Sequence, residues 1–139
     1  MAVFVPRGDA GPKEIRRRAV RCAVDLLAGL RAANRELRGR GAEPLQVRIG
    51  IAAGPLVQGK MGSSAKFEYT VIGDVVNVAA RLESQASPGH VLVTSDVWNT
   101  FQDEPPATIR PVGRQIISVK GKQQMIDVVE LGVTDDSHQ

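Results

Sequence analysis

The feature that most constrains this chain is a change in the spacing of its apolar residues, from a helical period to a strand period. Between Pro12 and the glycines Gly39 and Gly41, apolar side chains recur every three or four positions, which predicts one long amphipathic helix. From Leu45 to Ile51 the period becomes two, which predicts a strand with one buried face. The pattern therefore indicates a mixed α+β domain. The expected core-facing stripe of the helix is Ile15, Ala19, Cys22, Ala23, Leu26, Leu30, Ala33 and Leu37.

The rest of the chain continues this mixture of helix and strand. A second helix is expected from Asp74 up to the Pro88-Gly89 stop, and a short one around Trp98. The polar residues 133–139 are expected to form a disordered tail, which leaves residues 1–132 as one domain. Further strands are expected at Met1–Val5, Leu56–Met61, Phe67–Ile72, Val91–Val93, Thr108–Val112, Gln115–Lys120 and Gln124–Leu131.

Composition limits the cell compartment and the kinds of partner that we expect for this chain. The chain has 139 residues, of which 42% are hydrophobic, enough for a single domain with its own core. One cysteine, Cys22, excludes an internal disulfide framework and fits a reducing compartment. No apolar run approaches the roughly 20 residues that a membrane helix needs. We therefore expect a cytoplasmic chain without a membrane segment.

Basic residues gather in the first third of the chain. Residues 7–48 hold eleven Lys and Arg against five Asp and Glu, whereas the whole chain has a net charge of +3. Such a run favours a solvated helix face over a polyanion site. A nucleic-acid-binding domain is one hypothesis for it, but only 4% of the residues are aromatic, too few for a base-stacking sheet. We therefore expect no nucleic-acid partner.

The residues best suited to chemistry are Asn77 and Arg81, four positions apart on the second predicted helix and so on one face of it. An amide suits a sugar hydroxyl, and a guanidinium fork suits phosphate oxygens. Four motifs surround and follow them in order: R-I-G-I-x-x-G-P (48–55), Y-x-V-I-G-x-x-V-N-x-A-x-R-L (69–82), P-G-x-V-L-V-T (88–94) and V-K-G-K (119–122). Together these motifs resemble the catalytic domain of the class III nucleotidyl cyclases, the adenylate and guanylate cyclases.

The resemblance implies a fold, a reaction and a set of roles. The implied fold is α+β, a ferredoxin-like mixed sheet with helices packed on one face. The implied reaction converts ATP to cyclic AMP and pyrophosphate in intracellular signalling, with Asn77 and Arg81 as the transition-state pair and Lys120 on the terminal phosphates. Thr70 stands where many members place an aspartate that reads the purine edge, which resembles the threonine-type, bicarbonate-responsive subgroup. This departure bears on base selectivity, and ATP is favoured over GTP.

The resemblance also marks what this chain lacks. Family members bind Mg or Mn through two aspartates. One lies on the first strand of the domain, and the other lies in a Gly-Asp turn just before a strand similar to Met1-Ala2-Val3-Phe4. We therefore expect no metal ligand in this chain, which corresponds to a domain without its N-terminal metal-binding part. The ions would be held by a partner chain or by that missing part.

Such domains work as head-to-tail dimers, so the implied partner is ATP together with a second cyclase domain, in a homodimer or a heterodimer. Alone, the chain is expected to be inactive or nearly so. The alternative reading is a non-catalytic cyclase-like module that only dimerises or regulates.

Overall fold

The computed structural model describes residues 2–5, 8–61, 68–104, 106–119 and 124–134, with the backbone alone for 60–61 and 68–71. The α+β class is confirmed. In chain order the elements are α1 (Pro12–Gly39), β1 (Ile49–Ile51), β2 (Val57–Met61), β3 (Glu68–Ile72), α2 (Asp74–Gln85), β4 (Val91–Thr94), α3 (Ser95–Trp98), a 3-10 turn (Asn99–Phe101), β5 (Ile109–Ser118) and β6 (Met125–Val133). No helix in the described ranges combines the length and the apolarity needed to cross a bilayer.

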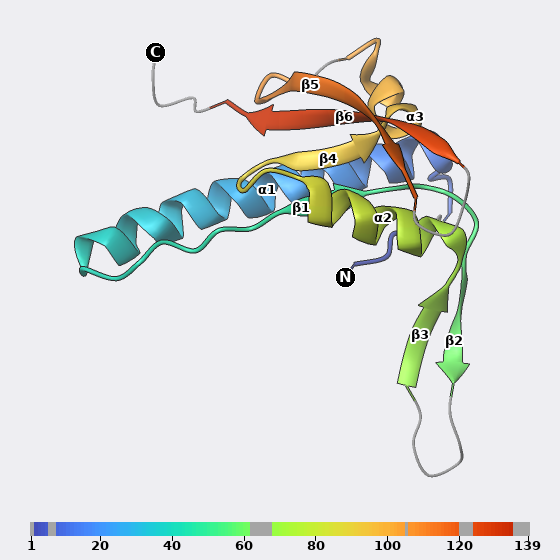
Figure 1. The fold of residues 1–139 in the computed structure, drawn as a ribbon, viewed down its shortest axis with the longest axis horizontal. Helices are drawn as coiled ribbons and strands as arrows, with labels where there is room; N and C mark the ends of the chain where they lie inside the picture. The colour runs from blue at the N-terminus through green and yellow to red at the C-terminus, as the bar shows by residue number, and fades with distance from the viewer. Residues whose placement is uncertain (1, 6–7, 62–67, 105, 120–123, 135–139) are drawn as a thin grey trace.

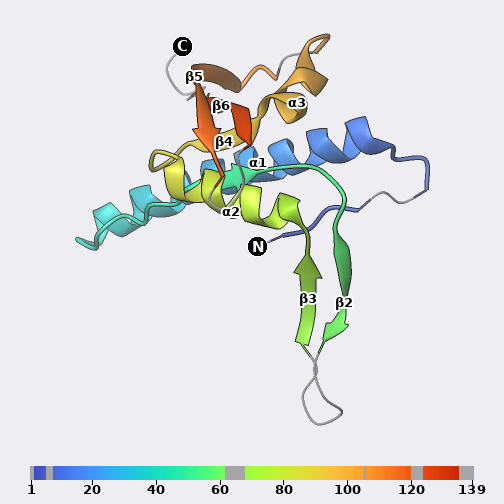
Figure 2. The same cartoon turned by 45° about the vertical axis from the view of Figure 1, so that its right-hand side comes forward.

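The strands form one mixed sheet and one separate hairpin. The main sheet has the order β1-β4-β6-β5, with β1 parallel to β4 and the other pairs antiparallel. β2 and β3 pair with each other in antiparallel register, Gly59 opposite Thr70. Figures 1 and 2 both show this hairpin projecting away from the sheet, beyond the end of α2 where β3 enters it. The chain thus leaves β1, makes the hairpin, and returns to the sheet through α2.

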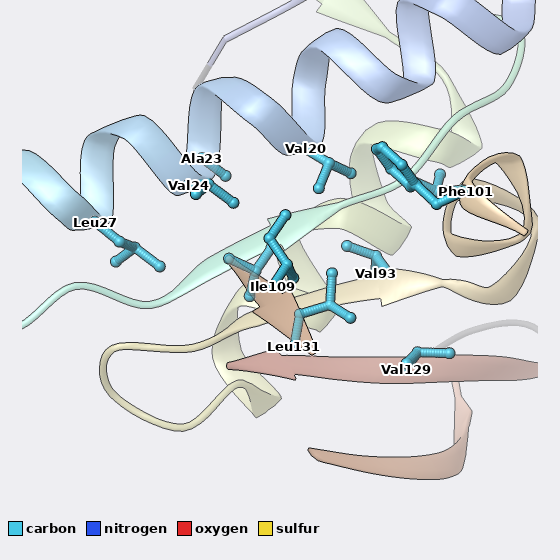
Figure 3. Packing of buried hydrophobic residues seen from close by; sticks show 11 residues of the cluster. Val20, Ala23, Val24, Leu27, Val93, Phe101, Ile109, Val129 and Leu131 are labelled. Atoms are coloured by element: carbon cyan, nitrogen blue, oxygen red, sulfur yellow. The ribbon is translucent and has the colours of Figure 1, made fainter. Parts of the chain in front are cut away.

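Two apolar clusters lie on opposite faces of the main sheet. Val91 and Val93 pack in one cluster with residues of α1 and the α3 region, as Figure 3 shows for Val93, Val20 and Phe101. Leu92, between them, packs in the other cluster with Leu82 of α2. Alternate side chains of a strand point to opposite faces, so α1 and α3 cover one face and α2 the other. Helices were expected on one face of the sheet only, whereas α2 lies on the face opposite to α1 and α3.

The buried face of α1 differs from the expected stripe. The helix begins and ends close to where it was expected, but Cys22 is exposed and Leu26 is 50% exposed. With this rotation Arg17 reaches the turn after α3: its Nε donates a hydrogen bond of 2.8 Å to the Thr100 carbonyl, and its guanidinium lies 5.5 Å from the centre of the Phe101 ring. The buried residues are Val20, Ala23, Val24 and Leu27, of which the stripe contains only Ala23.

Two predicted strands, the one starting at Leu45 and the one at Met1–Val5, differ from the strands of the structure. β1 begins at Ile49, because Leu45 is held by the side chain of Asn34 instead of by a strand. Asn34 Nδ2 donates to the Leu45 carbonyl at 2.8 Å, and the Leu45 N–H donates to Asn34 Oδ1 at 2.7 Å. Ala2–Val5 form no strand, and none of the described strands pairs with them. The expected strand at the start of the chain is therefore wrong for residues 2–5.

The last two strands are longer than the sequence indicated. The expected strands Thr108–Val112 and Gln115–Lys120 are one continuous strand, β5, with a register shift between Pro111 and Gly113. β6 continues through Val133, and the Thr134 N–H donates to the Thr108 carbonyl at 2.8 Å. Ordered pairing thus extends past residue 132, and residues 135–139 lie outside the described ranges.

Candidate functional site

The helix that carries the candidate residues is positioned by direct contact between backbones. Gly50, in the middle of β1, has α2 pressed against it. A Cβ added to Gly50 would lie 2.4 Å from the Glu83 nitrogen and 2.5 Å from the Ala79 oxygen. Since real Cβ atoms essentially never come so close to backbone, only glycine fits here. The glycine of the R-I-G-I motif therefore sets how α2 lies on the sheet.

The start of α2 is positioned in the same way. A Cβ on Gly73 would lie 3.0 Å from the Pro55 oxygen and 3.2 Å from the Leu56 Cα, so the turn after β1 passes directly beside the helix entrance. Asp74 provides the acidic residue of the first turn, which favours the positive end of the helix dipole. On the face of α2 that meets the sheet, Leu82 is fully buried. These contacts hold α2 at its start, middle and buried face.

Asn77 and Arg81 are one turn apart on this fixed helix. Asn77 is exposed and Arg81 is half-buried. Within the described residues, Arg81 Nε is buried and has no hydrogen-bond partner. A buried donor without an acceptor costs about 1–3 kcal/mol, so an anion that reaches this atom would restore a missing hydrogen bond. Asn77 and Arg81 line neither of the two grooves described elsewhere on the surface, and of the two only Asn77 is exposed.

The two other candidate residues are located only in part. The backbone of Thr70 lies in β3, which runs through Gly73 directly into α2, and its side chain lies outside the described residues. Lys120 also lies outside them. The chain enters the segment that holds Lys120 next to α2, because Ile117 of β5 packs in the same cluster as Leu82. The structure thus places Asn77 and Arg81 on one helix and joins the backbone of Thr70 to the start of that helix through Gly73.

The site was also tested for a divalent metal. In the described part of the chain, no group of three or more His, Cys, Asp and Glu side chains is arranged to hold a metal ion. The candidate pair on α2 is an amide and a guanidinium, and a guanidinium repels a cation. The described residues therefore do not fit a Mg or Mn site.

One electrostatic contact near α2 was not predicted from the sequence. The Ser87 N–H, just after the helix, donates to Glu130 Oε1 of β6 at 3.2 Å, and His90 Nδ1 lies 3.4 Å from the same oxygen. Burial alone would raise the pKa of Glu130, but the contacts with Ser87 and His90 outweigh it and hold that pKa below its usual value. Forty residues separate these groups along the chain, so no local pattern could reveal the contact.

Comparisons with known proteins identify the family of this chain. The sequence profile described as the adenylate and guanylate cyclase catalytic domain matches residues 7–129. This chain belongs to that family. An adenylate cyclase of Mycobacterium tuberculosis is 40% identical over 90 residues, which cover 65% of this chain and 19% of that protein.

Two solved cyclase structures share the fold. The adenylyl cyclase CyaB from P. aeruginosa aligns over 96% of this chain and 66% of its own, with 26% identity and a TM-score of 0.79. The guanylyl cyclase Cya2 aligns over 95% of this chain and 66% of its own, with 27% identity and a TM-score of 0.75. This cyclase-family chain therefore spans about two thirds of those structures and about a fifth of the M. tuberculosis relative.

Proposed function

We propose that this chain forms the part of an adenylate cyclase site that holds the ribose and the phosphates while ATP becomes cyclic AMP and pyrophosphate. The observation that carries the proposal is the buried, unpartnered Nε of Arg81, one helical turn from the exposed amide of Asn77. Both residues sit on a helix that Gly50 and Gly73 fix against the sheet. A fixed helix matters because a positional error of about 1 Å can cost a reaction about a hundredfold.

The chemistry follows from the two side chains. The ribose 3′-oxygen attacks the α-phosphorus, its proton leaves, and the bond to the pyrophosphate oxygen breaks. The Asn77 amide orients the sugar so that the attacking and leaving oxygens are in line. The Arg81 guanidinium donates to the oxygens of the α-phosphate as charge builds on them. These two roles account for an amide and a guanidinium at this spacing.

Thr70 and Lys120 complete the nucleotide contacts in this proposal. A threonine hydroxyl can accept from the adenine amino group or donate to a ring nitrogen. We assign Thr70 to the base, because β3 leads straight into α2, and Lys120 to the terminal phosphates. Adenine over guanine is part of the proposal: the family includes both specificities, as CyaB and Cya2 illustrate. Assignment to the threonine-type subgroup stands on Thr70 alone.

A second cyclase domain is the remaining part of the proposal. Asn77 lies on an open face, so a partner can cover it, and Mg or Mn would be held by that partner's carboxylates. The β2–β3 hairpin supports an assembly because it projects from the body and exposes Val57 by 67% and Ile72 by 50%. Apolar side chains on a projecting arm favour burial against another chain. We therefore propose a head-to-tail dimer in which each chain contributes different groups to a site.

The experiment mixes this chain with a longer cyclase domain that keeps its metal-binding half and carries alanine at its own Asn and Arg positions. Cyclic nucleotide formation is measured with Mn-ATP and with Mn-GTP. The proposal predicts little turnover by either protein alone and turnover of ATP by the mixture. The Arg81→Ala variant should abolish that turnover, whereas Arg114→Ala, an exposed arginine on β5, should not. Dimerisation without turnover would instead identify a non-catalytic cyclase-like module, and turnover of GTP alone would overturn the choice of base.

A further inference from the structure

The face of α1 that packs on the sheet is apolar in the first half of the helix and becomes polar and basic in the second half. Val20, Val24 and Leu27 pack against the sheet. The same spacing of three and four then continues with Arg31, Asn34 and Arg38. Figure 1 shows the second half of α1 extending past the end of the sheet. Arg31, Arg35 and Arg38 are exposed on this half of the helix, so their guanidinium groups stay in contact with solvent.

A groove lies between these arginines and the ends of β5 and β6. Its volume is about 620 Å³, within the range of about 300–1,000 Å³ that small-molecule sites occupy. Arg31, Arg35 and Arg38 line one side, and Thr108 and Thr134 the other. No residue of α2 lines it. The groove is therefore separate from the candidate cyclase site, which lies on the other face of the sheet.

The arginines of this groove differ from those nearer the start of α1. Arg16 and Arg17 pair with carboxylates, Asp96 at 3.6 Å and Glu104 at 3.5 Å. Arg35 and Arg38 have no hydrogen bond or ion pair with any described residue. Their guanidinium donors are therefore free to bind a ligand.

Two further contacts shape the groove. Arg31 Nη2 donates to the Val133 carbonyl at 2.8 Å, which ties the helix to the end of β6 and leaves its other donors free. Asn34 uses its amide on Leu45, as described above, and so fixes the helix end without serving a ligand. Among the described lining residues, Asp25 is the one carboxylate against three arginines, so this part of the groove carries a positive charge.

We propose that this groove binds a small anion with two or more phosphate groups. Arg35 and Arg38 lie one turn apart, so each can hold a separate phosphate by its fork of donors. The Thr108 hydroxyl opposite can donate to a remaining oxygen, whereas the Thr134 hydroxyl already donates to the Ala107 carbonyl at 3.5 Å. Two adjacent carboxylates can bind the same arginines, more weakly than two phosphates do. Asp135 and Asp136 follow Thr134 directly in the sequence. The test therefore separates a free polyphosphate from these two residues.

The test is calorimetric titration of the full chain with inorganic pyrophosphate in EDTA, where no divalent metal assists the cyclase site. We expect binding that the double variant Arg35→Ala/Arg38→Ala weakens by roughly 10- to 100-fold, and that Arg114→Ala, an exposed arginine outside this groove, leaves unchanged. Arg81→Ala, measured in parallel, reports any binding at the cyclase site. Backbone amide signals of Thr108 and Thr134 should shift on titration. Thermal unfolding of each variant establishes that it is folded.

Three outcomes are informative. Equal binding by the wild type and the double variant would overturn the proposal, as would binding that only Arg81→Ala removes. The arm with Asp135→Asn/Asp136→Asn distinguishes the two sources of negative charge. Tighter pyrophosphate binding by that variant would support an anion groove for which the two carboxylates compete, and unchanged binding would support a groove for free polyphosphate alone.

Discussion

Replacing Gly50 by alanine perturbs the one contact that fixes α2 on the sheet. The new Cβ would lie 2.4 Å from the Glu83 nitrogen, whereas ordinary contacts begin at 3.4 Å, so the helix must retreat by about 1 Å. Both nearest atoms are backbone, so no side chain can rotate to relieve the clash. Overpacking of this kind costs typically about 1–3 kcal/mol, and we expect a loss of that size in the free energy of unfolding.

The measurement is denaturant unfolding, followed by cyclic AMP formation in the mixture with the longer domain. Because α2 carries Asn77 and Arg81, a displacement of about 1 Å should lower turnover by about a hundredfold even where the variant is folded. Gly29→Ala is the matched control, since nothing lies within 4 Å of its added Cβ and it sits inside α1. That variant should gain up to about 1 kcal/mol and keep its turnover. Unchanged stability and turnover in Gly50→Ala would refute the packing argument.

Three further outcomes follow from single contacts. Leu82→Ala removes a fully buried side chain and should lower the free energy of unfolding by about 2–5 kcal/mol in urea, with full stability contradicting the second core cluster. The native pKa of Glu130 lies below its unfolded value, so its contribution to stability is present above about pH 4.5 and is lost as the pH falls through the native pKa. Glu130→Gln should therefore reduce this loss of stability at acid pH, measured by thermal melts over a range of pH. An identical pH profile for the two proteins would contradict the contact. Asn34→Ala should speed hydrogen exchange of the Leu45 amide by at least tenfold, and unaltered protection would show that another group holds that segment.

The sequence predicted most of what positions the candidate site. Motif spacing located α2 correctly, since a strand, a Gly-Asp pair and an apolar period lie within one short stretch. The motif spacing assigned no packing role to Gly50. It could not show that Gly50 touches Ala79 and Glu83, because that contact joins two elements separated by the β2–β3 hairpin. Local patterns report a single element, whereas the placement of α2 depends on two.

The rotation of α1 was beyond the sequence for a similar reason. Apolar residues occupy two adjacent faces of this helix, and periodicity cannot decide between the faces centred on Leu26 and on Leu27. The face that is buried packs Val20, Val24 and Leu27 in the core, and it brings Arg17 to the turn after α3, more than eighty residues away. Leu45 was assigned to a strand because its neighbours alternate, yet the amide of Asn34 satisfies its backbone instead. In both cases the outcome depends on contacts between residues of different segments.

The central claim is that Arg81 acts on the phosphate in the transition state. The direct measurement is the rate of cyclic AMP formation by the mixed domains at saturating Mn-ATP, for the wild-type chain and for Arg81→Ala and Arg81→Lys. The account predicts that alanine lowers kcat by roughly a hundred- to a thousandfold with little change in KM, and that lysine restores only part of the rate because it lacks the planar fork. An Arg81→Ala chain that supports the wild-type kcat would contradict it.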